Sequence, residues 1–582
     1  MRSKMSKKLE KDVVAQISVN KLMEHATFFA QEDRESGSPG EARACQYFQK
    51  FMSSLGFETQ LMEIENFISL PIRAMLNVLS PEGRAITGLT PSFSASCPEG
   101  VEGDLVYLPK GANADVAGKI VIQHGLAAPL PTFEMEKRGA SGQVWINAGE
   151  LPVNCIASTI WGHPTPETSN RLPKTPILSL GSSDGEYLKS ICNNGSVRVR
   201  LFTELKTGFM KVPLAVAEVK GVTEPDKYVL FNGHIDSWHK GASDNGTANA
   251  CILETARVIS KYRERLRRGI RFIWWSGHSQ GRYSGSTWYA DHFWADLHRN
   301  AIVHLNVDSL GCQGATYYGE VECTSEMYDL GRDVIKQYTG QSPSYDRMGH
   351  TGDNSFWGVG LPTLFQLLSR QPPEPGGKEV LVKGLPWFWH TAADTIDKID
   401  PNILLIDTRV YMAALWRLCV NPVLPMNFVP VADEFNKILN ILKTKTFGFF
   451  DLNLAIEKAQ TLRVAAEKLF NFCRRLEAGI PEWPLTPAPE IEELNNCLMR
   501  LSRILIPVNY SEADPFDMDL AVSIPPLPRF QRVALLGKMD PKSWEFKFLE
   551  RKMLRERNRI CFALEKASKA IEGTLAKLLL NK

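Results

Sequence analysis

Four side chains with metal-binding chemistry end predicted strands or lie in the loops that follow them. KYVLFNGHID is predicted to be a buried strand that ends at His234 and Asp236, and Asp244 follows in the glycine-containing loop GASDNG. The predicted strand AIVHLNVD ends at Asp308, and the later loop WFWHTAADT contains His390. Ligands of open α/β sheets bind beyond the carboxyl ends of the strands, so we expect these side chains to meet at one sheet edge.

The expected chemistry of this set is metal-assisted hydrolysis. Imidazole and carboxylate groups are ligands of zinc in hydrolytic sites, and one carboxylate can bridge two metals. Each of these residues alone is more often a structural hydrogen-bonding group. Gathered in one crevice, however, they cost desolvation free energy unless a cation compensates them. The sequence therefore predicts a site for one or two divalent metal ions, with zinc as the expected metal.

Four segments in fixed order resemble the zinc exopeptidases related to glutamate carboxypeptidase II and the transferrin receptor. They are GHIDSWHKGASDNGTANA, LNVDS, GDNSFWGVGLP and HTAADT. The resemblance implies that Asp244 bridges two metals and that His390 binds one of them. His234 and Asp308 then complete the other site. Asp236 would hydrogen-bond the ring of His234 and fix its tautomer, a supporting role in catalysis.

The chain departs from this family where two adjacent glutamates are expected, a general base followed by a metal ligand. The corresponding stretch reads FIWWSGHSQGRYSGSTWYADHF. Aligned on the preceding tryptophan, the pair becomes His278 and Ser279. Aligned on the following Gly-Ser, it becomes Ser279 and Gln280. Neither alignment keeps a carboxylate at either position of the pair.

Three hypotheses follow for His278. It replaces a glutamate as a metal ligand, because imidazole suits zinc and other first-row metals. Alternatively it is the general base or acid, the work that histidine performs most often in enzymes, and the protein then holds only one firm metal. In the third hypothesis catalysis is lost and the protein only binds a metal or ligand.

Further residues near these motifs are candidates for substrate binding. Arg282 and Tyr283 follow the altered segment, where they could bind a substrate carboxylate or polarise a carbonyl. His350 and Asn354 lie in the segment DRMGHTGDNS, next to the loop that resembles a substrate-side loop. His239 follows His234 in the same loop.

The pattern of elements predicts an α/β fold. Residues 9–31 and 40–55 are predicted helices, ANACILETARVISKYRERL an amphipathic helix, and IRFIWWSG and LPTLFQLL strands of a mainly parallel sheet. Helices are also predicted over 432–445, 453–478, 488–504 and 548–580, with a proline-rich connection over 505–545. The resemblance implies a three-layer sandwich of zinc-exopeptidase (phosphorylase/hydrolase-like) type with an inserted protease-associated β domain and a C-terminal helical domain. The expected parts are an N-terminal catalytic segment 1–69, the insertion 70–205, the metal-binding α/β domain 206–424 and the helical domain 425–582.

Composition limits the compartment and the partners. The 582-residue chain has a net charge of +2, too small to favour nucleic acid or an anionic membrane as the main partner. Its eleven cysteines are scattered, which suits a reducing compartment. The sequence shows no signal-peptide core and no apolar run of about 20 residues. We therefore expect a cytoplasmic protein.

The expected function is metal-dependent hydrolysis of an amide (C–N) bond in a peptide or small amide. A non-peptide amide, carbamate or cyclic amide is an alternative substrate within the enzyme class. A non-catalytic binding or scaffold protein of transferrin-receptor type is the alternative from a different class. The resemblance also implies a homodimer formed through the helical domain, whose apolar stripes could instead pack within one chain.

Overall fold

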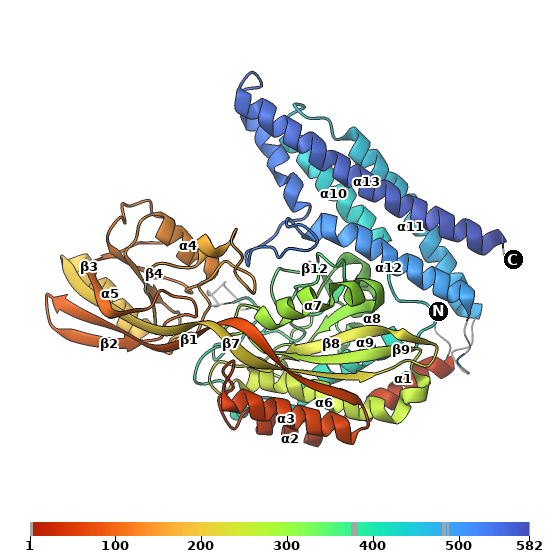
Figure 1. The fold of residues 1–582 in the computed structure, drawn as a ribbon, viewed down its shortest axis with the longest axis horizontal. Coiled ribbons are helices and arrows are strands. Elements are labelled where there is room, and N and C mark those ends of the chain that lie inside the picture. Colours follow the sequence, from red (N-terminus) through yellow and green to blue (C-terminus); the bar gives the residue numbers. More distant parts are fainter. Residues whose placement is uncertain (1–3, 374–381, 480–484, 486–487, 581–582) are drawn as a thin grey trace.

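A computed structural model describes residues 4–373, 382–479, 485 and 488–580 of the chain. Figure 1 shows three parts: a central α/β domain, a smaller module at the end of a long strand pair, and a group of helices packed on the other side of the domain. One 13-stranded sheet runs through the first two parts in the order β12-β11-β13-β10-β8-β9-β7-β3-β4-β5-β6, with β1 paired to β7 and β2 paired to β1. The expected α/β fold is confirmed.

The N-terminal region forms three helices: α1 (Lys4–Val14), α2 (Val19–Phe29) and α3 (Pro39–Ser54). A single helix over 9–31 was the wrong expectation. Ser18 interrupts it, since its extended backbone and its hydroxyl, which accepts from the Lys21 N–H, start a new helix. Ser38 caps α3 in the same way by accepting from Glu41 N–H.

The centre of the domain is a set of buried parallel strands. These are β8 (Glu224–His234), β9 (Arg268–Trp275), β10 (Ala301–Asn306) and the two-residue β13 (Thr363–Leu364). The antiparallel pairs β7–β9 and β11–β13 make the sheet mixed. The outer strands β11 (Glu320–Cys323) and β12 (Ser344–Arg347) pair in parallel. Because Asn232 pairs with Asn306, His234 and Asp308 leave the sheet side by side.

Helices cover both faces of this sheet. On one face, α6 (Thr247–Ile259) packs on β8 between α2 and α9 (Pro401–Val420), and α8 (Tyr328–Thr339) packs on α9. On the other face, α7 (Ser284–Asn300) packs on β1, β8 and β10. The amphipathic character expected for α6 is wrong, because every residue of α6 except Arg257 is buried. Neighbouring helices cover the side that would otherwise meet solvent.

The smaller module is joined to the domain by two very long strands. β1 (Glu58–Ser80) and β7 (Val197–Val219) pair antiparallel along their whole lengths. The module adds β2 (Arg84–Gly88), β3 (Cys97–Tyr107), β4 (Ile120–His124), β5 (Gly142–Ile146) and β6 (Ile177–Leu180). Two helices, α4 (Pro129–Lys137) and α5 (Ser182–Asn194), accompany these strands. The module extends to the left in Figure 1.

The C-terminal region is helical, as the apolar stripes indicate. It contains α10 (Val429–Lys445), α11 (Asn453–Gly479), α12 (Pro489–Tyr510) and α13 (Trp544–Leu580), and α13 packs on α11 and α12. The proline-rich connection begins later than expected, because α12 continues through Pro507. A 3-10 helix, Pro528–Lys538, interrupts the connection. Among the described helices, none has the length and apolar character that a membrane span requires.

Candidate metal centre

Four of the expected ligands, His234, Asp244, Asp308 and His390, converge where β8 and β10 end. His234 Nε2 lies 2.9 Å from Asp244 Oδ1 and 3.8 Å from Asp308 Oδ1. The other oxygen of Asp244, Oδ2, lies 3.0 Å from His390 Nε2. One carboxylate therefore faces two imidazoles, one with each of its oxygens. The side chains of Asp308 and His390 keep 13% and 12% of their surface exposed, so the cluster is open to solvent.

The two imidazoles have their other ring nitrogens engaged by backbone carbonyls. His234 Nδ1 lies 2.9 Å from the carbonyl oxygen of Asp236, and His390 Nδ1 lies 2.9 Å from that of Asn154. A carbonyl only accepts, so both rings carry a proton on Nδ1, and in the neutral ring Nε2 holds a lone pair. His234 Nε2 is buried and makes no hydrogen bond of good geometry despite its short distance to Asp244.

Asp236 supports His234 through a different atom from the one expected. The backbone carbonyl contacts the ring, whereas carboxylate Oδ1 lies 3.4 Å away. Oδ2 of Asp236 accepts hydrogen bonds of 2.8 Å from the Ser36 hydroxyl and from the Ser279 N–H. Asp236 thereby ties the end of β8 to the segment that follows β9.

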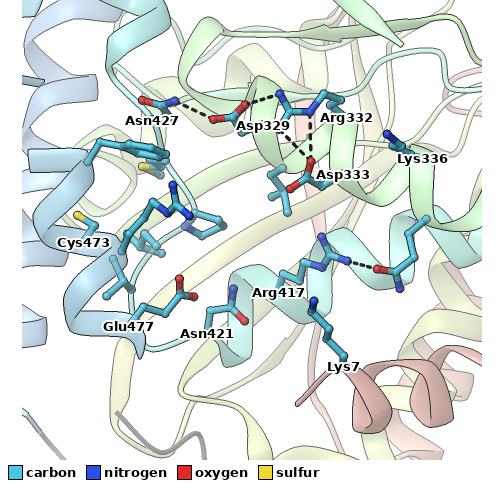
Figure 2. A pocket seen from close by; sticks show the side chains of 18 residues that line it. Lys7, Asp329, Arg332, Asp333, Lys336, Arg417, Asn421, Asn427, Cys473 and Glu477 are labelled. Carbon is cyan, nitrogen blue, oxygen red and sulfur yellow. Dashed lines mark hydrogen bonds and ion pairs between the residues drawn. The ribbon is translucent and has the colours of Figure 1, made fainter. Parts of the chain in front are cut away.

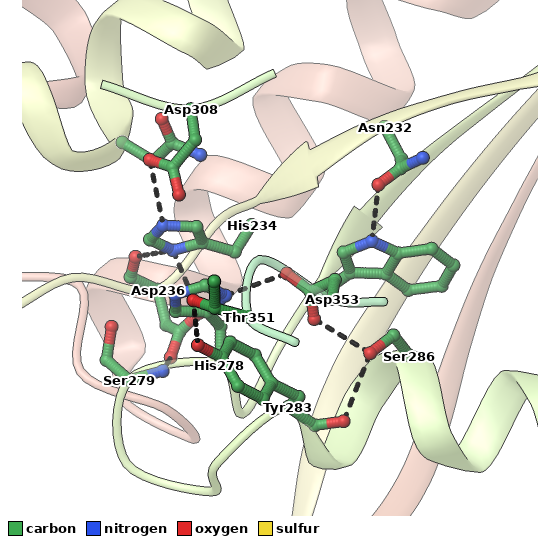
Figure 3. Close-up of polar contacts among 12 residues, drawn as sticks. Asn232, His234, Asp236, His278, Ser279, Tyr283, Ser286, Asp308, Thr351 and Asp353 are labelled. Carbon is green, nitrogen blue, oxygen red and sulfur yellow. Dashed lines mark hydrogen bonds and ion pairs between the residues drawn. The ribbon is translucent and has the colours of Figure 1, made fainter. Parts of the chain in front are cut away.

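His278 lies against His234 within the same cluster. The two rings stack in parallel with their centroids 3.7 Å apart. One potential ligand atom from each of His234, His278 and Asp308 lies within 4.8 Å of the other two. His278 Nδ1 lies 2.7 Å from Asp353 Oδ2, while Asp353 Oδ1 accepts from the Ser286 hydroxyl (Figure 3). Asp353 thus fixes the ring and leaves Nε2 as the nitrogen that is available to a ligand.

The two positions after His278 serve the scaffold. Ser279 donates its backbone N–H to Asp236, as described above. Gln280 accepts from Ser36 through Oε1 and donates through Nε2 to the carbonyl of Ser237. Both side chains are buried. Neither residue supplies a carboxylate near His390.

The electrostatics of the cluster depend on these contacts. Burial alone lowers the pKa of His234, but Asp236, Asp244 and Asp308 outweigh it and hold this pKa well above its usual value. Burial raises the pKa of Asp244, but His234 and His390 outweigh it and hold this pKa well below its usual value. The site thus has a strong preference for positive charge between its carboxylates.

Two residues that sequence reasoning missed hold the loop that carries Asp244. Asp394 accepts from the backbone N–H groups of Ser243 (2.9 Å) and Asp244 (3.1 Å). Arg34, itself buried, donates to the carbonyls of Ile235, Lys240 and Gly241. Asp394 and Asp353 lie within HTAADT and GDNSFWGVGLP, two of the segments that carry the family resemblance. Both residues could therefore have been singled out from the sequence. Arg34 comes from a distant segment and gave no such signal.

The substrate-side candidates differ in their surroundings. His239 lies beside the centre, with Nε2 2.8 Å from Asn154 Nδ2. His350 is buried, stacks on Trp161 with ring centroids 3.9 Å apart, and faces the carbonyl of Leu520 through Nδ1. Burial lowers the pKa of His350 to about 3, so this ring is neutral.

Asn354 is buried and uses its side chain internally. Its amide group donates to the carbonyls of Gly349 and Thr351, and its oxygen accepts from the Thr363 hydroxyl. Tyr283 packs edge-on against His278 with ring centroids 4.8 Å apart, and its hydroxyl lies 2.9 Å from that of Thr351. Arg282 neighbours Tyr283, so the structure brings this pair, unlike Asn354, to the rim of the cluster.

A cavity of about 650 Å³ lies elsewhere, between the N-terminal helix, α8, the end of α9 and α11 (Figure 2). It contains several cations, two of which are ion-paired. Arg332 pairs with Asp329 and Asp333, and Arg417 pairs with Glu10. None of the residues of the metal cluster lines this cavity, so its size does not make it the catalytic site.

Comparison with known proteins gives one family match and several distant relatives. Residues 215–414 match the model of peptidase family M28. Carboxypeptidase Q of Xenopus laevis is 24% identical over 393 residues, which are 63% of this chain and 79% of the relative. The probable glutamate carboxypeptidase VP8 of Zea mays is 25% identical, but the match spans only 46% of this chain and 39% of the plant protein.

Solved structures show the same fold. The zinc aminopeptidase BSAP of Bacillus subtilis aligns with a TM-score of 0.54 and 19% identity, over 69% of this chain and 95% of that one. A peptidase M28 precursor of Shewanella amazonensis aligns with a TM-score of 0.55 and 18% identity, over 71% and 97%. The matched segment 215–414 contains the ends of β8 and β10 and all of the clustered side chains described above. Residues 215–414 thus match peptidase family M28, in agreement with the resemblance to zinc exopeptidases that the sequence motifs carry.

Proposed function

We propose that the protein is a metal-dependent hydrolase that cleaves an amide bond of a peptide or small amide. One observation carries the proposal. His234 and His390 each bear a proton on Nδ1, and each points Nε2 at an oxygen of Asp244 about 3 Å away. In the neutral rings these atoms are lone-pair donors facing a carboxylate, an arrangement that a cation between them stabilises.

The donor set fits a divalent cation. His234, His278 and Asp308 would hold it, with one oxygen of Asp244 close by. When bound, such a cation lowers the pKa of water and polarises a substrate carbonyl. The donors are nitrogen and oxygen, which suits zinc. We therefore infer one firm zinc site per chain.

A second ion would have weaker support. His390 and Asp244 offer two donors, but no carboxylate stands at 278, 279 or 280, the positions that align with the family's glutamate pair. Ser279 uses its backbone N–H and Gln280 its side-chain amide in hydrogen bonds with the scaffold. We infer that His390 instead keeps Asp244 in place by donating an Nε2–H to Oδ2 across the 3.0 Å contact, which requires protons on both of its ring nitrogens. Asn154 orients the ring of His390 from the other side.

The remaining residues position the ligands. Asp353 fixes the ring of His278, so that Nε2 faces the cluster, and Asp236 fixes the ring of His234 through its carbonyl. His278 Nε2 is then available either to a cation or to a proton at the solvent-accessible side of the site. Of these two roles we propose metal binding, because one ring nitrogen of His278 lies within 4.8 Å of the ligand atoms of His234 and Asp308.

A peptide is the substrate class that the relatives favour. Their names describe carboxypeptidases and aminopeptidases. The altered glutamate pair leaves room for a non-peptide amide, carbamate or cyclic amide, since no carboxylate base stands at 278 or 279. The same alteration supports a second candidate function, a protein that binds a metal or ligand without catalysis.

Three structural proposals accompany the function. We propose that the module on β1 and β7 corresponds to the protease-associated domain, that the helical region after residue 425 pairs two copies of the chain, and that the protein works in the cytoplasm. Exposed aromatic side chains at Trp544, Phe548 and Phe562 on α13 support the pairing. Light scattering of the purified protein tests it, and a monomer at micromolar concentration would contradict it.

Elemental analysis tests the functional proposal. We expect close to one zinc per chain, lost in His234→Ala and in His278→Ala and retained in the matched control His292→Ala, whose imidazole is exposed on α7. A metal-bound protein that hydrolyses a panel of N-acetylated and free peptides supports the enzyme. A metal-bound protein inactive on peptides and small amides supports the binding protein. A folded protein that takes up no metal refutes the hydrolase and favours the non-catalytic protein.

A further inference from the structure

Arg282 lies at the rim of the metal cluster in an unusual backbone conformation. Arg282 and Tyr283 both have positive φ angles, +50° and +69°, and they lead directly into α7. Such left-handed conformations cost free energy in residues other than glycine, asparagine and aspartate, and strained residues gather at functional sites. The Arg282 carbonyl is fixed by the N–H of Gly162, which belongs to the loop before β6 of the smaller module.

The guanidinium of Arg282 has almost no partners. Its contacts are long, 3.5 Å from Nη1 to the Tyr283 hydroxyl and 3.4 Å from Nη2 to the carbonyl of Ala521. Its Nε is buried and makes no hydrogen bond. The fully buried Arg268 differs: it pairs with Glu224 and donates to the carbonyls of Leu418, Asn421 and Pro422.

Within the part of the chain that the structure describes, no carboxylate forms an ion pair with Arg282. A partly buried cation without a counter-ion is costly, because desolvation is not offset by attraction or by hydrogen bonds. Guanidinium presents its donors in a fixed fork that matches a carboxylate. The start of α7 adds the positive end of a helix dipole beside it.

The position of Arg282 relates it to the metal cluster. The guanidinium carbon lies 4.8 Å from the centre of the Tyr283 ring, and that ring lies 4.8 Å from the ring of His278. One aromatic ring therefore separates the cation from a proposed metal ligand. Roughly two or three extended residues, at about 3.5 Å each, can span such a distance.

All three parts of the protein meet around this guanidinium. Trp161, from the smaller module, stacks on His350 and contacts Tyr283 with ring centroids 4.1 Å apart. Ala521, from the segment after α12, accepts from Arg282 and donates its N–H to the carbonyl of Thr159. The arginine is thus held at a junction, where its position is fixed before any ligand binds.

We propose that Arg282 binds a carboxylate of the substrate, one or two residues from the bond that is cleaved. This inference rests on the proposed function and narrows it to acidic ligands: peptides with a free C-terminus or with an acidic side chain near the cleaved bond. Both kinds of peptide present a carboxylate to Arg282. The experiment below distinguishes a C-terminal carboxylate from a side-chain carboxylate. Arg282 is then a specificity residue outside the metal-binding set.

Three matched peptides test the proposal: N-acetyl-Ala-Ala-Leu with a free C-terminus, the same peptide as a carboxamide, and N-acetyl-Ala-Glu-Leu carboxamide. Binding to the purified full chain is measured by calorimetry, and hydrolysis by kcat/KM. We expect at least one carboxylate peptide to bind on the order of 100-fold more tightly than the neutral carboxamide, as for a buried charge pair. Arg282→Met should weaken the binding of that peptide to the level of the neutral carboxamide. Arg282→Lys should restore part of the difference in affinity.

The control variant Lys174→Met removes an exposed positive charge from the smaller module and should change neither binding nor hydrolysis. Preference for the free C-terminus identifies a terminal carboxylate, and preference for the glutamate peptide identifies a side chain. Equal binding of all three peptides to the unchanged protein would overturn the proposal. So would an Arg282→Met variant that loses the same fraction of its affinity for all three peptides. Carboxylate-selective binding without hydrolysis would refute the proposed function while leaving this inference intact.

Discussion

Asp353→Asn is the sharpest test of how His278 works. Asp353 is 1% exposed, and its two oxygens have separate partners: Oδ2 holds His278 Nδ1 at 2.7 Å, and Oδ1 accepts from the Ser286 hydroxyl at 2.8 Å. Asparagine keeps the size of the side chain but removes its charge. The imidazole then loses the anionic partner that raises the basicity of Nε2 and fixes its direction.

The size of the effect follows from this single contact. Loss of such a partner typically lowers metal affinity or activity by about 10- to 100-fold, which corresponds to about 1.4 to 2.7 kcal/mol. If His278 is a metal ligand, the loss appears in the zinc dissociation constant. If it moves a proton, the dissociation constant stays the same and kcat falls instead.

Competition with a chromophoric chelator measures the zinc affinity, and initial rates on a cleaved peptide measure kcat. Ser286→Ala is the matched control, because it removes the other partner of Asp353 and leaves the carboxylate on His278. Its effect should stay within a few-fold. A change below about threefold in both quantities for Asp353→Asn would refute the role assigned to His278.

Three further predictions concern metal and pH. Removal of zinc by a chelator should lower the melting temperature reversibly, because a ligand at 100 times its Kd stabilises the folded state by about 2.7 kcal/mol; calorimetric scans with and without zinc check this, and an unchanged midpoint would contradict it. Ser279→Glu should raise the metal content from one toward two per chain, with Ser279→Gln unchanged, because it returns a carboxylate to the position of the family's pair; elemental analysis decides. Burial raises the pKa of Glu326 to about 7 from an ordinary value of 4.5, so the folded state keeps a proton that the unfolded state releases. As the pH rises from about 4.5 to 7, the free energy of unfolding should therefore fall by on the order of 3 kcal/mol. Urea titrations at several pH values measure this fall, and the Glu326→Gln variant should not show it.

The sequence predicted the position of the centre better than its details. His234 and Asp308 were expected at adjacent strand ends, and the parallel register of β8 and β10 places them there. Segments with strong apolar stripes, such as α11 and α13, were found close to their expected bounds. These features depend on local periodicity and on sheet geometry, which the chain carries explicitly.

Other features depend on contacts between distant segments. The partner of His278 is Asp353, and the loop with Asp244 is held by Arg34 and Asp394. The motif segments contain Asp353 and Asp394, but no local pattern shows which groups these side chains contact. The helix predicted over 488–504 was expected to give way to a proline-rich connection, yet α12 continues through Pro507 to Tyr510. The burial of α6 on all sides likewise arises from helices that pack over it from elsewhere in the chain.

The pairing of β1 with β7 has a mechanical consequence for the centre. Both strands run from the domain sheet into the module, with register shifts between Pro71 and Arg73 and between Val78 and Ser80, so a paired ladder joins the module to the domain. The module in turn supplies Asn154, whose carbonyl holds the ring of His390 and whose N–H bonds the His390 carbonyl. Bending of this paired ladder would therefore displace the imidazole of His390, so the stiffness of the strand pair contributes to the alignment of a side chain at the proposed metal site.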